Sequence, residues 1–121
     1  MQSKRKKILV VDDEQDILDF LQIILEEEGY NVMTTDKGEY LEKLHNGGLP
    51  DVILLDMLLS GKDGRAIVKY LKSQPETQNI PVIMFSAHPS AEESALKAGA
   101  DDFVAKPFEI DFLLDKIAQY A

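Results

Sequence analysis

Five polar residues follow four runs of apolar residues, at positions suited to chemistry: Asp12 with Asp13, Asp56, Ser86 and Lys106. Three carboxylates brought close together cannot all stay ionised without a counter-charge. A hard cation such as Mg²⁺ prefers oxygen ligands, and no Cys or His follows any of these runs. Mg²⁺ and Lys106 together would balance the three negative charges. A carboxylate held there can attack phosphorus, because that reaction depends on cation charge and in-line positioning more than on base catalysis.

Five short apolar runs recur along the chain: Ile8–Val11, Val32–Met33, Val52–Leu55, Val82–Phe85 and Phe103–Ala105. They are rich in β-branched residues, and several lack polar alternation, which is typical of parallel strands buried on both faces. Helical segments separate them. The pattern predicts an α/β, doubly wound (βα)5 flavodoxin-like fold with a five-stranded parallel sheet of order 2-1-3-4-5 and helices on both faces. Ligands bind such sheets beyond the carboxyl ends of the strands, where the five polar residues would meet.

The segments between the runs have the spacing of amphipathic helices. In the first, one face is apolar and a glycine stands where the helix should end, at Ile17, Leu18, Leu21, Ile24, Leu25 and Gly29. The later helices are predicted at Tyr40–Leu44 before Gly47-Gly48, at Ile67–Leu71 before Pro75, at Ser90–Gly99 and at Ile110–Ile117. Ser90–Glu93 reads as a capping box that opens a short fourth helix, which ends at Gly99.

Taken singly, several residues also have simpler explanations. The acidic pair after the first run fits a helix N-cap. Phe103 fits the hydrophobic core, and Asp101-Asp102 fit a solvated turn. His45 and His88 have no acidic or histidine neighbour at ligand spacing. We therefore assign neither histidine to metal binding or phosphotransfer.

Four of the motifs, in this order on a (βα) pattern, resemble the receiver domain of bacterial response regulators, in the CheY-like superfamily: Asp12-Asp13, Asp56, Ser86-Ala87 and Lys106-Pro107. The stretch Ala98–Phe103 is a fifth match. The resemblance covers essentially the whole chain. It implies that residues 1–121 form a single receiver (response regulatory) domain, with residues 1–6 as a flexible N-terminus.

The resemblance implies a phosphorylation-dependent signalling switch of a two-component system or phosphorelay. Asp56 would accept a phosphoryl group from a phosphohistidine on a sensor histidine kinase or a histidine phosphotransfer protein. Asp13 and Asp56 would bind Mg²⁺ through their carboxylates, Asp12 largely through water, and Leu58 through its backbone carbonyl. Mn²⁺ or Ca²⁺ could substitute for Mg²⁺. Lys106 would pair with the phosphate.

The same resemblance assigns a response to the phosphate. The Ser86 hydroxyl would move to hydrogen-bond it, and Phe103 would occupy the space that Ser86 vacates. This would change the surface around the fourth predicted helix (Ser90–Gly99), the fifth strand (Phe103–Ala105) and the fifth helix (Ile110–Ile117). The Lys106–Pro107 bond would be cis, and the kinase would contact helix 1 near Gln15–Gln22. Such a domain is not an enzyme, since it catalyses only its own aspartyl phosphorylation and dephosphorylation.

The sequence departs from the family in two places. Receivers commonly have Pro four residues after the acceptor, where this chain has Ser60. Its absence would loosen the loop that carries the Leu58 carbonyl and would affect metal affinity. Because Leu58 is apolar and His88 is bulky, we expect slow loss of the phosphoryl group. The Ser86–Gly99 segment is about two residues shorter than in receivers, so we expect a different geometry of homodimer or partner contact.

Composition excludes several other classes of protein. The net charge of −9 argues against direct nucleic-acid binding, and the Lys4–Lys7 run fits a solvated, frayed terminus. No apolar run reaches the roughly 20 residues that a membrane span needs, and no export signal is present. The chain has no cysteine, in keeping with a cytoplasmic protein.

Three other classes of protein could share these features. A pseudo-receiver that serves as a protein docking module would keep the fold without phosphorylation. An aspartate-nucleophile phosphatase would usually place a second Asp two residues after its nucleophile, where Glu14 stands, and would need a cap for which 121 residues leave no room. A flavodoxin-like cofactor domain is disfavoured by the acidic first turn, which would repel a phosphate. The downstream protein target leaves no trace in the sequence, and the chain is either a stand-alone protein or an excised domain.

Overall fold

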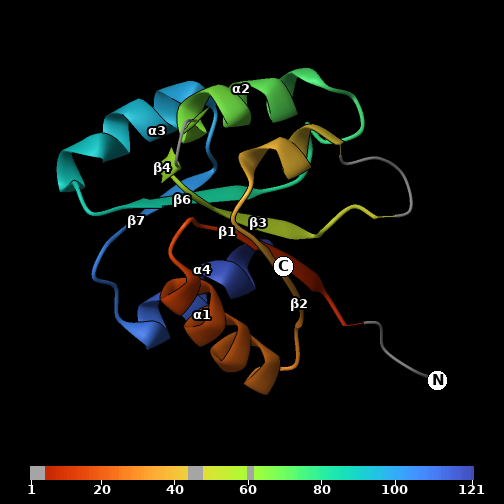
Figure 1. Ribbon diagram of the computed structural model, residues 1–121, viewed down its shortest axis with the longest axis vertical. Coiled ribbons are helices and arrows are strands. Elements are labelled where there is room, and N and C mark those ends of the chain that lie inside the picture. The colour runs from red at the N-terminus through yellow and green to blue at the C-terminus, as the bar shows by residue number, and fades with distance from the viewer. Residues whose placement is uncertain (1–4, 44–47, 60–61) are drawn as a thin grey trace.

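The central sheet has five parallel strands, each built on one of the apolar runs. In this computed structural model, which describes residues 5–43, 48–59 and 62–121, the strands lie in the order β2-β1-β3-β6-β7 (Figure 1). This order confirms the predicted 2-1-3-4-5 sheet. The strand bounds are β1 Lys7–Val11, β2 Asn31–Thr35, β3 Val52–Asp56, β6 Val82–Ser86 and β7 Asp102–Ala105.

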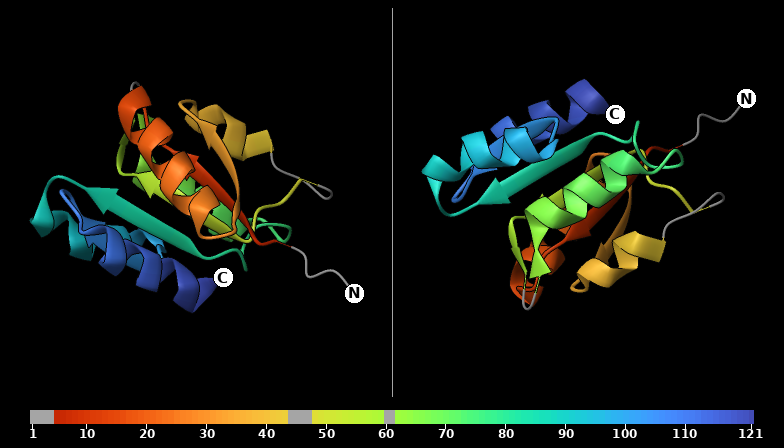
Figure 2. Two further views of the ribbon diagram at one scale, coloured as in Figure 1. Left: turned by 90° about the horizontal axis from the view of Figure 1, so that it is seen from below. Right: turned by 90° about the horizontal axis from the view of Figure 1, so that it is seen from above.

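Helices cover both faces of this sheet. From below, Figure 2 shows α1 and α4 in front of the strands, and from above it shows α2 and α3. Alternate residues of β1 pack against the two helix layers, because neighbouring side chains of a strand point to opposite faces of the sheet. Ile8 and Val10 pack in the core beneath α1 and α4, whereas Leu9 and Val11 pack beneath α2 and α3. The helix bounds are α1 Gln15–Glu27, α2 Gly64–Ser73, α3 Glu92–Ala98 and α4 Ile110–Tyr120.

The first helix forms as its apolar spacing predicts. Leu18, Leu21 and Leu25 of α1 are buried against the sheet. Gly29 follows the helix with a φ of 94°, a conformation that glycine adopts without the steric cost of a Cβ. The chain then turns directly into β2, which pairs with β1 in parallel.

The second predicted helix is wrong in type over the residues that are described. Gly38–Lys43 forms a 3₁₀ helix between β2 and β3. Leu41 is buried in the core, but Tyr40 is 42% exposed, so the two do not form the expected apolar stripe. Leu44, the third residue of that pattern, lies outside the described residues. A short segment with a single buried anchor gains little from α-helical packing.

The fourth predicted helix ends where expected but begins differently. Gly99 closes α3 with a φ of 116°, as predicted. The capping box is wrong, however. Ser90 lies within a 3₁₀ turn at Pro89–Ala91, and the N-cap of α3 is Ala91, which has no side-chain cap. The preceding 3₁₀ turn continues into α3 and thereby replaces a side-chain cap at its start.

A small hairpin follows β3 that the sequence pattern did not predict. Its strands, β4 (Leu58–Leu59) and β5 (Lys62–Asp63), are antiparallel and pair Leu58 with Asp63. Two-residue strands are too short to carry a periodicity signal. The hairpin joins the carboxyl end of β3, at Asp56, to the start of α2.

Asp101 and Asp102 do not form the predicted solvated turn, because both carboxylates are hydrogen-bonded to neighbouring elements. The Asp101 carboxylate accepts hydrogen bonds from Lys72 Nζ and from the Val82 backbone N–H, both at 2.8 Å. The Asp102 carboxylate accepts hydrogen bonds from Lys116 Nζ at 3.0 Å and from the Tyr120 hydroxyl at 3.1 Å. These contacts tie the start of β7 to α2, β6 and α4.

The N-terminal basic run is partly inside the sheet. Lys7 opens β1, and the Lys6 carbonyl accepts the Asn31 backbone N–H at 2.9 Å. Residues 1–4 of the expected tail lie outside the described residues. Over the described part of the chain, no helix combines the length and the apolar character needed to cross a membrane.

Candidate phosphoryl-acceptor site

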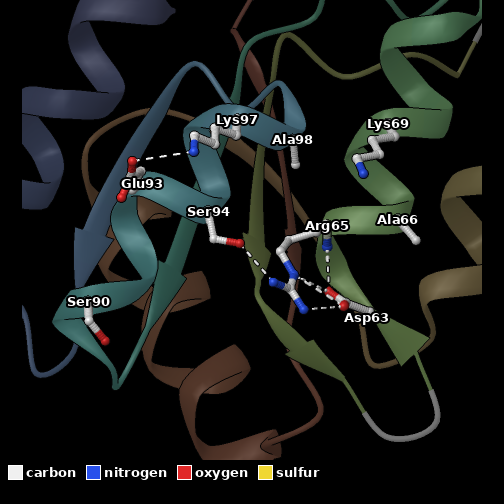
Figure 3. Close-up of a pocket in the computed structure, with 9 residues that line it drawn as sticks. All are labelled: Asp63, Arg65, Ala66, Lys69, Ser90, Glu93, Ser94, Lys97 and Ala98. Carbon is white, nitrogen blue, oxygen red and sulfur yellow. Dashed lines mark hydrogen bonds and ion pairs between the residues drawn. The ribbon is translucent and has the colours of Figure 1, made fainter.

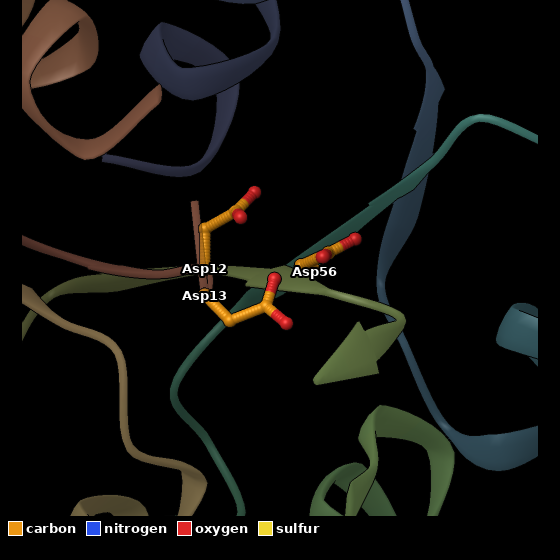
Figure 4. A group of neighbouring side chains, drawn as sticks. All are labelled: Asp12, Asp13 and Asp56. Atoms are coloured by element: carbon orange, nitrogen blue, oxygen red, sulfur yellow. The ribbon is translucent and has the colours of Figure 1, made fainter. Parts of the chain in front are cut away.

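Three carboxylates meet at the carboxyl ends of β1 and β3, as predicted. These strands are direct neighbours and pair Val11 with Leu55, so the residues that follow lie side by side. Asp12 and Asp13 follow β1, and Asp56 is the last residue of β3. One oxygen from each carboxylate lies within 4.8 Å of the other two (Figure 4).

The two aspartates after β1 have different environments. Asp12 is fully buried, and its Oδ1 accepts the Glu14 backbone N–H at 2.8 Å. Asp13 is exposed. The N-cap of α1 is Glu14, so neither aspartate occupies the N-cap position. The simple explanation of this pair as a helix cap is therefore wrong.

Lys106 reaches this cluster from the end of β7. Its Nζ lies 3.1 Å from Asp12 Oδ2, 3.6 Å from Asp56 Oδ1 and 3.9 Å from Glu14 Oε1. The ammonium also stands 4.8 Å from the centre of the Phe85 ring, and only 15% of the side chain is exposed. The Lys106–Pro107 bond is cis, as expected. Sequence reasoning missed Glu14 as a neighbour of this lysine, because a glutamate in a helix-start loop carries no distinguishing signal.

The electrostatics of Asp56 show that the site lacks positive charge. The pKa of the Asp56 carboxyl is raised from 3.8 to about 6, chiefly by burial and next by the neighbouring Asp12 carboxylate. Lys106 and a hydrogen bond from the Leu58 backbone lower this pKa but do not offset the burial. One ammonium therefore does not neutralise three carboxylates. An oxygen-lined cluster with excess negative charge fits a hard divalent cation such as Mg²⁺.

Ser86 and Phe103 lie on the neighbouring strands β6 and β7. Ser86 ends β6 and is 3% exposed, and its Oγ accepts the His88 backbone N–H at 3.1 Å. Phe103 of β7 is opposite Met84 and belongs to the core beneath α2 and α3. Its predicted place in the core is confirmed. The switch roles of both residues stay predictions.

Gly64 is a further site residue that the sequence reasoning missed. A Cβ at this position would lie 2.7 Å from the Asp56 carbonyl oxygen and 2.9 Å from that of Met57. The Gly64 N–H donates to the Met57 carbonyl at 2.8 Å, which closes the base of the hairpin. Only a residue without a side chain lets α2 begin this close to Asp56. The Asp63-Gly64 pair in the loop was the signal that could have located it.

Comparison with known proteins identifies the family. Residues 8–118 match the family model described as "Response regulator receiver domain". The chain belongs to this family, whose members are signalling domains rather than classical enzymes. In this member of the family, five parallel strands have helices on both faces. The acidic cluster lies at the carboxyl ends of the strands, where the strand order reverses.

Relatives and solved structures agree with this assignment. The chain is 37% identical over 113 residues to the phosphate regulon transcriptional regulatory protein PhoB of Rhizobium meliloti, covering 92% of this chain and 50% of that protein. It thus spans about half the length of this relative. The receiver domain of NtrX from Brucella abortus is 36% identical with a TM-score of 0.83, covering 93% of this chain and 96% of that chain. Response regulator TrrA from Thermotoga maritima, solved in complex with Mg²⁺-BeF, is 30% identical with a TM-score of 0.85, covering 96% and 99%.

Proposed function

We propose that this receiver domain is a switch that accepts a phosphoryl group on Asp56 and changes its surface in response. The observation that carries the proposal is the meeting of Asp12, Asp13 and Asp56 within 4.8 Å, with Lys106 Nζ 3.6 Å from the acceptor carboxylate. A carboxylate with a pKa raised to about 6 is ionised at neutral pH and available as a nucleophile.

The reaction transfers a phosphoryl group from a phosphohistidine of a sensor histidine kinase or histidine phosphotransfer protein. The phosphorus–nitrogen bond breaks, its electron pair stays on the imidazole, and a bond forms between phosphorus and an Asp56 carboxylate oxygen. The imidazole nitrogen then takes a proton from solvent if it is not already protonated at its other position. Lys106 stands where its ammonium can pair with the transferred phosphoryl oxygens.

The residues present suit a bound Mg²⁺. Asp13 and Asp56 would hold it through carboxylate oxygens, Asp12 through water and Leu58 through its backbone carbonyl, with Mn²⁺ or Ca²⁺ as substitutes. When bound, the cation supplies the positive charge that phosphoryl transfer requires. The similar receiver TrrA has been crystallised with Mg²⁺-BeF, which supports the same metal class here.

The response would pass through Ser86 and Phe103. Phosphorylation adds about one to two negative charges and three acceptor oxygens, which attract a nearby hydroxyl donor. The Ser86 hydroxyl oxygen now accepts a hydrogen bond from the His88 backbone N–H, and turning toward the phosphate would release that contact. Phe103 would then move into the vacated space, altering the surface made by α3, β7 and α4.

Two local features bear on how long the signal lasts and where it goes. Leu58 is 58% exposed and His88 is exposed beside the site; neither side chain favours a water aligned for attack, so we propose slow loss of the phosphoryl group. A half-life of seconds would contradict this. α3 has only seven residues, and we propose that its short length gives a homodimer or partner contact unlike the common one. A structure with the common dimer contact through α3 would oppose it.

The partners follow from the family and the charge. The kinase or phosphotransfer protein would dock near Gln15–Gln22 of α1, and the activated surface would bind a downstream protein rather than nucleic acid. Residues 1–121 would act as one receiver domain, and a cytoplasmic location remains our expectation from the sequence. The activities of whole relatives such as PhoB concern proteins about twice this length.

Incubation with a small acyl phosphate and Mg²⁺, followed by intact-mass spectrometry, tests the proposal. A docking module without phosphorylation would give no adduct even with candidate kinases. Turnover of a generic phosphomonoester would instead support an aspartate-nucleophile phosphatase.

A further inference from the structure

Arg65 bridges the acceptor hairpin and α3. It stands near the start of α2, and its side chain crosses a groove of about 540 Å³ between α2 and α3 (Figure 3). Its Nε and Nη2 donate to the Asp63 carboxylate, at 3.0 Å to Oδ1 and at 3.1 and 2.6 Å to Oδ2. Its Nη1 donates to Ser94 Oγ of α3 at 2.7 Å. The guanidinium therefore contacts both sides of the groove at once.

On the hairpin side, Asp63 is held in three ways. It pairs with Leu58 in the antiparallel ladder, its carboxylate accepts the Arg65 backbone N–H at 2.9 Å as the N-cap of α2, and it binds the Arg65 side chain. Leu58 is the residue whose carbonyl is expected to face the cation. The position of that carbonyl therefore depends on where Asp63 is held.

The Arg65–Asp63 contact restrains the loop after Asp56, which lacks the proline that is common in the family. A proline four residues after Asp56 would fix one backbone angle, but the chain has Ser60 there. The hairpin is instead fastened at its base, where the Gly64 N–H donates to the Met57 carbonyl at 2.8 Å, and at Asp63 by Arg65. A contact with α3 thus replaces a covalent restraint within the loop.

We propose that Arg65 and Ser94 are positioning residues: they hold the Leu58 carbonyl in place for the cation and couple cation binding at Asp56 to α3. The proposal rests on the proposed function, because it assumes that a cation binds there. It describes a second connection from the acceptor to α3, separate from Ser86 and Phe103. Coupling between two sites is reciprocal, so cation binding must also stabilise the Arg65–Ser94 contact.

The chemistry of the bridge requires an arginine. A guanidinium offers five N–H donors in a planar fork and can bind a carboxylate and a hydroxyl together, whereas a lysine has a single ammonium. The Arg65 and Asp63 side chains are 44% and 42% exposed, so water competes with their contacts. The effect of breaking one contact is accordingly modest, at about threefold in cation affinity.

The test compares two serines of the same groove. Ser94→Ala removes the contact between Arg65 and α3. Ser90→Ala is a matched control, since the Ser90 side chain makes no hydrogen bond among the described residues and also lines the groove. Mg²⁺ is titrated while the amide signals of Met57 and Leu58 are followed by NMR. We expect Ser94→Ala to weaken Mg²⁺ binding about threefold, Arg65→Lys to weaken it at least as much, and Ser94→Thr, which keeps the hydroxyl, to restore it.

Hydrogen exchange supplies a second readout that needs no metal. In metal-free protein, Ser94→Ala should speed exchange of the Gly64 amide, while Ser90→Ala should not. Adding Mg²⁺ should slow exchange in α3 of the wild type but not of Ser94→Ala. Equal Mg²⁺ affinity and equal Gly64 exchange in Ser94→Ala, Ser90→Ala and wild type would overturn the bridge. Failure of the wild type to bind Mg²⁺ would instead contradict the proposed function, and the metal-free Gly64 exchange would then decide the bridge alone.

Discussion

Replacing Asp56 with asparagine should make the metal-free protein more stable at neutral pH. The pKa of this carboxyl is about 6 in the folded protein, against 3.8 for the ordinary group, chiefly because the side chain is buried. A raised carboxyl pKa means that folding disfavours the ionised form. The resulting penalty disappears only well below the ordinary value of 3.8, where the group is protonated in both states, and is fully present above the folded value of about 6. Stability therefore falls as pH rises through this window.

The size of the effect follows from the shift. A difference of about two pKa units corresponds to about 3 kcal/mol of unfolding free energy, at 1.36 kcal/mol per unit. The asparagine keeps a polar group but loses part of the hydrogen bond to the Leu58 backbone. We therefore expect Asp56→Asn to stabilise the protein by about 2 kcal/mol at pH 7.5 and by no more than about 0.5 kcal/mol at pH 4.

Urea unfolding at the two pH values, in the presence of a chelator, measures this difference. Asp115→Asn is the control, because Asp115 is an exposed residue of α4 whose side chain has no hydrogen bond or ion pair within residues 5–43, 48–59 and 62–121. Saturating Mg²⁺ should stabilise the wild type and shrink the advantage of the variant, since the cation supplies the missing charge. If Asp56→Asn is no more stable than the wild type at pH 7.5 without metal, the site does not lack positive charge and this account of it is wrong.

Three further substitutions test other parts of the site. Lys106→Gln should slow phosphorylation by an acyl phosphate about tenfold or more, because it removes the ammonium group that lies 3.6 Å from the Asp56 carboxylate. An unchanged rate of phosphorylation, measured by mass spectrometry, would contradict this. Gly64→Ala should lower the unfolding free energy by about 1–3 kcal/mol, because its Cβ would meet backbone oxygens at 2.7 and 2.9 Å; denaturant unfolding with no loss would refute the close approach. Ser86→Ala should leave phosphorylation of Asp56 in place but reduce the amide shifts that phosphorylation causes in α3 and β7; full-size shifts would exclude Ser86 from the response.

The sheet and the acidic cluster could be predicted because their signals are local. Val52–Leu55 is a continuous apolar run, and every residue of it is fully buried in the structure. Parallel strands end at the same edge, so the polar residues that follow four of the five runs had to gather there. Asp12, Asp56 and Lys106 meet there even though Lys106 is 94 residues from Asp12 along the chain.

The features that escaped prediction depend on contacts without a local pattern. Arg65 and Ser94 are 29 residues apart, and an arginine beside an N-cap aspartate reads as an ordinary surface residue. Asp101 and Asp102 looked like a solvated turn because their partners Lys72 and Lys116 come from other elements. The 3₁₀ helix at Gly38–Lys43 and the two-residue strands of the hairpin are too short for a hydrophobic period to distinguish them from loop or α-helix.

The most direct test of the switch is intact-mass spectrometry after incubation with a small acyl phosphate and Mg²⁺. Wild type, Asp56→Asn and a chelated wild-type sample are compared under the same conditions. The account predicts one phosphoryl adduct on the wild type and none on the other two. An adduct that persists in Asp56→Asn or with the metal chelated would contradict the assigned acceptor or the assigned metal, and no adduct at all would favour a docking module.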